Sequence, residues 1–198
     1  MENRKYPSKQ EEKFLALGYN RFLDLYKEVS SVGFWSKAKE ERLLVVKELL
    51  SVYVELIKYR PLGFLLSNSK RPHTELVGKH LVGFLRNLLL HFPFYSSWEE
   101  IVFDKELITS VETCGKIDQF LTKEHPVDIK YRLWNHKSKE MVYIEVNLQT
   151  RYREGMEISL SSIIPEKEGV MLLSLYMYSI LMSQVEEISE QEHETGQN

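Results

Sequence analysis

Apolar residues recur at intervals of three or four along most of the chain, the spacing that places them on one face of an α-helix. Four long stretches follow this pattern, at residues 8–32, 36–59, 73–92 and 166–187. Residues that cap or stop helices stand at their ends, and Pro93 ends the third stretch. The pattern predicts a mainly α protein, a helical bundle of four main helices.

The period of the pattern changes before the last of these helices. Apolar and polar residues alternate over residues 129–134 and again over 141–148, and the polar segment 135–139 joins the two runs. Such alternation is typical of half-buried strands, so we expect a small β-hairpin at about residues 128–148. Its apolar face requires cover by the helical core, because an isolated hairpin is marginal in water.

Weaker patterns lie between the third long helix and the hairpin. They predict one short helix capped at Ser96 or Ser97 and reaching Ile101, and another over residues 116–123. No repeat or linker divides the chain, so we expect residues 1–189 to form a single domain. A polar, acidic and disordered tail is expected at residues 190–198.

Charge and composition narrow the possible functions. The net charge of −3 excludes a globally basic surface that binds nucleic acid through charge alone. The lone cysteine, Cys114, excludes an internal disulfide and a thiolate zinc cluster. Metal-binding and nucleotide-binding motifs are absent from the sequence, so we expect no metal and no other cofactor.

The chain carries no pattern that directs it to a membrane. The charged first residues do not resemble a secretory signal, and the uncharged segment 170–185 is shorter than a spanning helix. This segment is therefore expected to be a buried helix, and the protein is expected to be cytoplasmic with no membrane contact.

The end of the third helix holds the best candidate for chemistry. Arg86, Asn87 and His91 bring a permanent cation, an amide and an imidazole close together in an apolar setting. Arg binds phosphate through its planar guanidinium, and His transfers protons near neutral pH. These groups suit RNA cleavage by the neighbouring 2′-hydroxyl, which needs a base, an acid and a cation near the phosphorane.

Arg86 and His91 are five positions apart, so on an ideal helix their side chains diverge by roughly 140°. Convergence requires the reach of the Arg side chain, the end of the helix at Pro93, or a second copy of the chain. Identical helices that pair across a two-fold axis bring Arg86 of one copy to His91 of the other. A simpler interpretation makes Arg86 a surface ion-pair partner and His91 a residue favoured by the helix dipole.

The sequence Arg86-Asn87-x-x-x-His91 resembles the R-x(4–6)-H signature of the HEPN superfamily, in which a polar residue, often Asn, follows the Arg. The resemblance implies a helical bundle and a metal-independent endoribonuclease that works as a homodimer with one composite site. It implies that Arg86 stabilises phosphate charge, His91 handles protons and Asn87 orients the site. Members paired with nucleotidyltransferase antitoxins often carry Tyr two residues after the His, where this chain has Pro93.

HEPN proteins are common in bacterial toxin–antitoxin, abortive-infection and other antiviral systems. The resemblance therefore implies a toxin or defence protein, with RNA as substrate and an antitoxin protein as a further partner. The alternative is a non-catalytic helical module with a degenerate HEPN fold that binds RNA or another protein.

The hairpin supplies a second candidate for RNA binding. Lys130, Arg132 and Trp134 alternate onto its outer face, and Lys137 follows in the turn. Basic side chains mixed with an aromatic ring can grip phosphates and stack a base. The alternative is a solvated sheet face whose lysines protect an edge strand.

Overall fold

The computed structural model describes residues 8–59, 75–110, 115–122, 128–148, 152–153 and 155–195, which form a mainly helical fold with two small pairs of antiparallel strands. The long helices are α1 (Lys9–Val29), α2 (Lys39–Lys58), α4 (Glu75–His91) and α8 (Glu166–Thr195). The shorter elements are η1 (Gly33–Ser36), α5 (Lys105–Ser110), α6 (Gly115–Thr122), α7 (Leu160–Ile163), β1 (Val102–Asp104), β2 (Asp128–Asn135), β3 (Glu140–Asn147) and β4 (Glu157–Ser159). The four predicted long helices are therefore confirmed.

The first helix begins as its sequence predicts. Ser8 is the N-cap, its hydroxyl accepts from the Glu11 amide, and the Glu11 carboxylate accepts from the Ser8 amide at 2.6 Å. This reciprocal arrangement satisfies two amides that the helix itself leaves without acceptors.

The expected start of the second helix at residue 36 was wrong. A 3₁₀ turn, η1, occupies residues 33–36, and α2 begins at Lys39. The turn forms because Phe34 is fully buried and its amide donates to the Ser31 hydroxyl at 3.1 Å.

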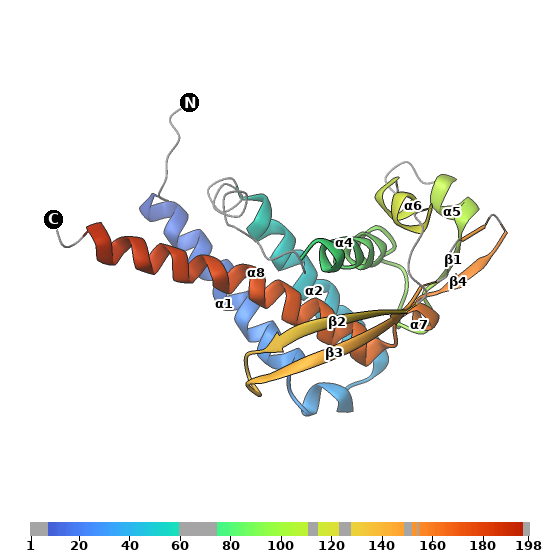
Figure 1. Ribbon diagram of the computed structural model, residues 1–198, viewed down its shortest axis with the longest axis horizontal. Helices are drawn as coiled ribbons and strands as arrows, with labels where there is room; N and C mark the ends of the chain where they lie inside the picture. Colours follow the sequence, from blue (N-terminus) through green and yellow to red (C-terminus); the bar gives the residue numbers. More distant parts are fainter. Residues whose placement is uncertain are drawn as a thin grey trace.

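Helix α8 runs through the middle of the molecule, with the β2–β3 hairpin along one side and α1 and α2 on the other (Figure 1). It also contacts α4, and its residues between Val170 and Leu181 are largely buried. The prediction of a buried helix here is confirmed. Among the described residues, no helix combines the length and apolarity needed to cross a bilayer.

The same helix continues to Thr195, into the acidic stretch from Glu190 where we expected an irregular tail. Glu and Gln are good helix formers, so an acidic composition does not by itself end a helix.

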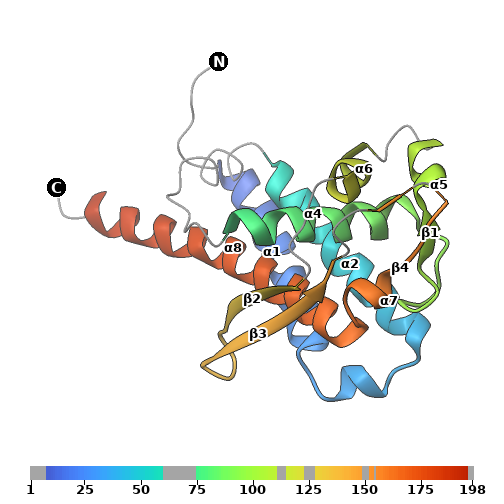
Figure 2. The same cartoon turned by 45° about the vertical axis from the view of Figure 1, so that its right-hand side comes forward.

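The predicted hairpin is confirmed as the antiparallel pair β2–β3. Tyr131 lies opposite Ile144 and Leu133 opposite Val142, and the apolar side chains on this face pack on the helical core. The hairpin contacts α7 and α8, as seen after rotation of the view (Figure 2).

The second strand pair lies at one end of the molecule with α5 and α6 (Figure 1) and was not predicted. The expected helix from Ser96 or Ser97 to Ile101 was wrong, because the segment turns and leads into β1 instead. Trp98 holds the turn: its ring is buried and its Nε1 donates to the Ile164 carbonyl at 3.0 Å. The short helix predicted at 116–123 is confirmed as α6.

Candidate functional site

One strip of α4 reaches the molecular surface, while most of the helix is buried among α2, α6 and α8. The strip, called the α4 strip below, consists of the exposed or half-buried residues His80, Gly83, Arg86, Leu90 and His91, together with the buried Asn87 that lies among them. At 100° per residue these six positions fall within an arc of roughly 140°, with Arg86 at one edge and His91 at the other. Arg86 and His91 therefore reach one surface of the molecule, whereas Asn87, between them on the helix, is buried.

Arg86 and Asn87 are brought into direct contact. The Arg86 side chain donates from Nε and from Nη2 to the Asn87 Oδ1 atom, at 3.3 and 3.2 Å. Asn87 is only 8% exposed, whereas Arg86 is half-buried. The amide thus anchors the guanidinium on the helix without neutralising it, because Asn carries no charge. No carboxylate among the described residues forms an ion pair with Arg86.

His91 lies apart from this pair, as the last residue of α4. Its side chain is exposed, and it stands in the final turn of the helix. Within the described chain no hydrogen bond joins it to Arg86. One chain therefore presents the two groups on one surface but at opposite edges of the strip.

The loop after His91 is held from α2 by a residue that sequence analysis missed. Lys47 donates from Nζ to the carbonyl oxygens of Pro93 and Tyr95, at 3.0 and 2.8 Å. Partial burial lowers the pKa of Lys47. No local signal identifies this residue, because its acceptors lie far along the chain and are backbone atoms.

An aromatic cluster borders the same loop. The rings of Phe92 and Phe94 meet edge to face at 5.7 Å, and Phe94 also contacts Tyr95 at 4.8 Å. Phe94 is 68% exposed, although it is fully apolar. The surface beside His91 thus combines a titratable group with an exposed apolar ring.

The outer face of the hairpin carries three of the four predicted RNA-binding residues. Lys130, Arg132 and Trp134 are exposed there. Lys130 forms an ion pair with Glu145 at 3.0 Å and lies 5.6 Å from the Tyr143 ring centre.

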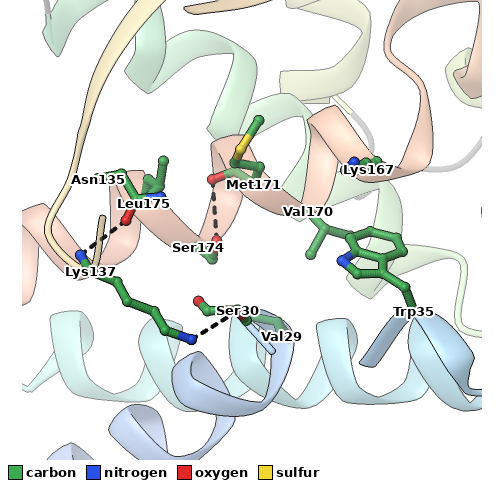
Figure 3. Close-up of a pocket in the computed structure, with 10 residues that line it drawn as sticks. All are labelled: Val29, Ser30, Trp35, Asn135, Lys137, Lys167, Val170, Met171, Ser174 and Leu175. Carbon is green, nitrogen blue, oxygen red and sulfur yellow. Dashed lines mark hydrogen bonds between the residues drawn. The ribbon is translucent and has the colours of Figure 1, made fainter. Parts of the chain in front are cut away.

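The fourth, Lys137, lies in the hairpin turn and extends toward the end of α1. Its Nζ donates to the Ser30 carbonyl at 3.2 Å, as Figure 3 shows. This contact satisfies a carbonyl that the helix end leaves free, so Lys137 has a structural partner away from the outer face.

A small pocket of about 150 Å³ lies between the end of α1, the turn and α8 (Figure 3). Trp35, Lys137 and Lys167 contribute to its wall, with Ser174 of α8. Arg86, Asn87 and His91 do not line it, so it is separate from the α4 strip.

The described residues contain no cluster of three or more His, Cys, Asp or Glu side chains placed to hold a metal ion. Comparisons of the chain with protein-family models, with curated proteins and with solved structures give no match. The function has to be inferred from the residues themselves.

Proposed function

We propose that the protein is an HEPN-like endoribonuclease in which two copies of the α4 strip form one composite site. The observation that carries the proposal is the half-buried Arg86 guanidinium, which Asn87 anchors on the same strip of α4 as the exposed His91. The mainly helical fold is compatible with this family. A cationic and a proton-transferring group on one rigid helix provide the functional groups that RNA cleavage requires.

The chemistry would use both copies of His91. One neutral imidazole takes the proton from a 2′-hydroxyl, whose oxygen then forms a bond to the adjacent phosphorus. The bond from phosphorus to the 5′-oxygen breaks, and the protonated imidazole of the second copy supplies the proton to that oxygen. The Arg86 guanidinium stabilises the negative charge on the phosphorane through its planar N–H groups. The products are a 2′,3′-cyclic phosphate and a 5′-hydroxyl.

The divergence of Arg86 and His91 is the reason for proposing a dimer. Packing of two α4 strips across a two-fold axis places Arg86 of one copy near His91 of the other. Gly83 lies between them on the strip, and a Cβ atom at this position would meet no heavy atom within 4 Å. Glycine destabilises a helix interior by about 1 kcal/mol relative to alanine. In this proposal Gly83 is present because only a residue without a side chain lets the backbone of a second helix approach closely.

A place in a cytoplasmic toxin or antiviral abortive-infection system belongs to the same proposal. It is supported by the resemblance of the Arg86–His91 segment to the family rather than by the geometry. In such a system an antitoxin protein would cover the α4 strip or prevent its pairing.

Cleavage of a labelled oligoribonucleotide by the purified protein tests the proposal. Arg86→Ala and His91→Ala should each lower the rate by about 10²–10⁴-fold, the range for loss of a general acid–base group or an electrostatic stabiliser. Arg21→Ala, which removes an exposed cation of α1, is the matched control and should cleave normally. Equal activity of all four proteins, or none in the wild type, contradicts the proposal.

Subunit mixing separates a composite site from a site within one chain. When wild type and His91→Ala are co-expressed in equal amounts, roughly a quarter of the dimers contain two intact copies. A composite site then gives roughly a quarter of full activity, whereas independent chains give half. If cleavage activity instead rises linearly with the fraction of wild-type chains, each chain acts independently and the dimeric site is wrong.

The alternative is a helical module that binds RNA without cleaving it. The exposed basic and aromatic side chains of the hairpin favour this alternative, because they suit binding and supply no proton transfer. If the wild type binds RNA and the RNA is recovered at full length, the binding module is the correct function.

A further inference from the structure

The β2–β3 hairpin has two faces of different character. Its inner face packs on the helical core, whereas its outer face exposes large side chains to solvent. Trp134 is 42% exposed and Tyr143 is 55% exposed, and Met141 is also exposed. Exposed aromatic side chains gathered on one small surface are typical of a binding site.

The strand register places these groups in an alternating arrangement. Arg132 lies opposite Tyr143, and Trp134 lies opposite Met141. The two aromatic rings are therefore diagonal neighbours on one face of the ribbon, with the Arg132 side chain beside them. Diagonal neighbours in an antiparallel pair are about 7–8 Å apart, close enough for two rings to hold consecutive stacked groups.

The charges on this face differ in their availability. Lys130 is already paired with Glu145 at 3.0 Å, whereas no carboxylate among the described residues pairs with Arg132. The face thus offers two flat apolar rings and one guanidinium that has no carboxylate partner among the described residues. These groups match a ligand that alternates flat rings with negative charges, as a nucleic acid strand does.

The shape of the face distinguishes single strands from duplexes. Bases can stack on Trp134 and Tyr143 only when they are free of a helix, because the bases of a duplex are stacked on one another. We propose that this outer face, defined by Arg132, Trp134 and Tyr143, is a binding platform for single-stranded RNA. The inference deepens the proposed ribonuclease function by naming the form of RNA that the protein binds. It rests on that function for the choice of RNA.

Stacking on the platform does not use the 2′-hydroxyl, so a single-stranded DNA of the same sequence should bind as well. Such DNA lacks the nucleophile of the proposed cleavage and reports binding alone. Fluorescence anisotropy with labelled 12-nucleotide single-stranded DNA, single-stranded RNA and duplex RNA measures the three dissociation constants. Both single strands should bind more tightly than the duplex.

Substitutions on the exposed face test the platform without disturbing the core. Trp134→Ala should raise the dissociation constant for single-stranded DNA roughly tenfold, the effect of losing one stacked base. Trp134→Phe keeps a ring and should bind nearly as the wild type does. Arg132→Gln should reduce the slope of log affinity against log salt by roughly 0.7, the value for one phosphate contact on a single strand.

Exposed positions on α1 provide matched controls, with Leu17→Ala for a lost apolar group and Lys13→Gln for a lost charge. Both should bind as the wild type does. Thermal melting shows whether each variant is folded, and Tyr143→Ala replaces Trp134→Ala if the latter is not.

The outcomes separate the platform from the ribonuclease. Loss of DNA binding in the hairpin variants supports the platform even when the wild type cleaves no RNA, in which case the ribonuclease proposal fails alone. If the hairpin variants bind and cleave as the wild type does, the platform is wrong, while the proposed site on the α4 strip is unaffected. Tighter binding of the duplex, or no binding of either single strand, also overturns the platform.

Discussion

The Lys47 side chain of α2 donates a hydrogen bond to the Pro93 carbonyl, which lies two residues after His91. A second bond from the same Nζ reaches the Tyr95 carbonyl. The ammonium group thereby fixes the loop that ends α4, and it does so from a neighbouring helix. The position of the His91 backbone thus depends on a contact between α2 and this loop.

Replacing Lys47 by Met should loosen this loop while keeping most of the apolar stem. The loss of two bonds from a charged donor should lower the free energy of unfolding by about 2 kcal/mol, measured by urea denaturation. RNA cleavage at saturating substrate should fall as well, since His91 loses its fixed position. Lys58→Met, on the same helix but at an exposed position paired with the neighbouring Glu55, should change neither quantity measurably. Unchanged cleavage in a loosened Lys47→Met protein would show that the loop does not position His91.

The pair Arg42–Glu166 joins the first turns of α2 and α8 and should contribute strongly to stability. Arg42 donates from Nε and Nη2 to the two carboxylate oxygens, at 2.9 and 2.6 Å, and the side chains are only 11% and 10% exposed. Removing one partner of such a pair leaves a charge with little access to water. Arg42→Met or Glu166→Gln should therefore lower the free energy of unfolding by about 3 kcal/mol.

The exposed pair Arg21–Glu48 between α1 and α2 is the matched comparison. Because water screens it, Arg21→Met should cost less than about 1 kcal/mol. Double-mutant cycles on both pairs measure the coupling free energies directly. Similar coupling in the two cycles would contradict the role assigned to burial.

Tyr19 should make the protein sensitive to alkaline pH. Burial raises the pKa of Tyr19 to about 12, and its hydroxyl faces the Leu181 carbonyl at 3.4 Å. A raised pKa means that the neutral phenol stabilises the fold fully below pH 10. This stability is lost as the pH rises from about 10 through about 12.

The pKa of this group is raised by about two units, so the full expected loss is about 3 kcal/mol. Urea denaturation of the wild type and Tyr19→Phe between pH 8 and 12 measures it, and the decline should be smaller in the variant. Tyr143→Phe removes a hydroxyl from the exposed hairpin face and should decline as the wild type does. If the free energy of unfolding falls equally with pH in Tyr19→Phe and in the wild type, Tyr19 is not the source of the alkaline sensitivity.

The sequence predicted those elements that are long enough to show several periods of the hydrophobic pattern. The four long helices and the hairpin follow directly from apolar spacing, and Ser8 marks the start of α1. Strands β1 and β4 have three residues each, too few to show an alternating pattern. Their position depends on Trp98, whose ring lies so close to Gly169 that a Cβ there would be 2.4 Å from a ring carbon. Such a tertiary contact has no local signature.

The candidate site was predictable only in part for the same reason. Helix geometry predicts that Arg86 lies beside Asn87 and that His91 points away from Arg86. In the structure Arg86 and Asn87 form a hydrogen-bonded pair, and the His91 imidazole lies apart from them. The contribution of Lys47 arises from packing between elements that are distant in the sequence. The contact between Lys137 and Ser30 could not be foreseen from alternation along the hairpin, because a turn residue can extend toward either face.

Gly83 provides the most direct test of the proposed pairing of α4 strips. Since a Cβ at this position meets no heavy atom within 4 Å, the single chain tolerates a larger residue. Gly83→Ala should therefore raise the stability of the monomer by up to about 1 kcal/mol. Gly83→Arg should also fold, because Arg is a good helix former, but its side chain would occupy the space that a second helix needs.

Sedimentation velocity over a range of concentrations distinguishes these effects. Gly83→Arg should dissociate at least about tenfold more readily than the wild type and lose RNA cleavage in parallel, because the composite site requires both copies. Ala16→Arg makes the same kind of change at an exposed position of α1 and should leave both properties unchanged. A Gly83→Arg protein that remains dimeric and active would place the contact between copies elsewhere. A wild type that cleaves RNA as a monomer would instead require Arg86 and His91 to act within one chain.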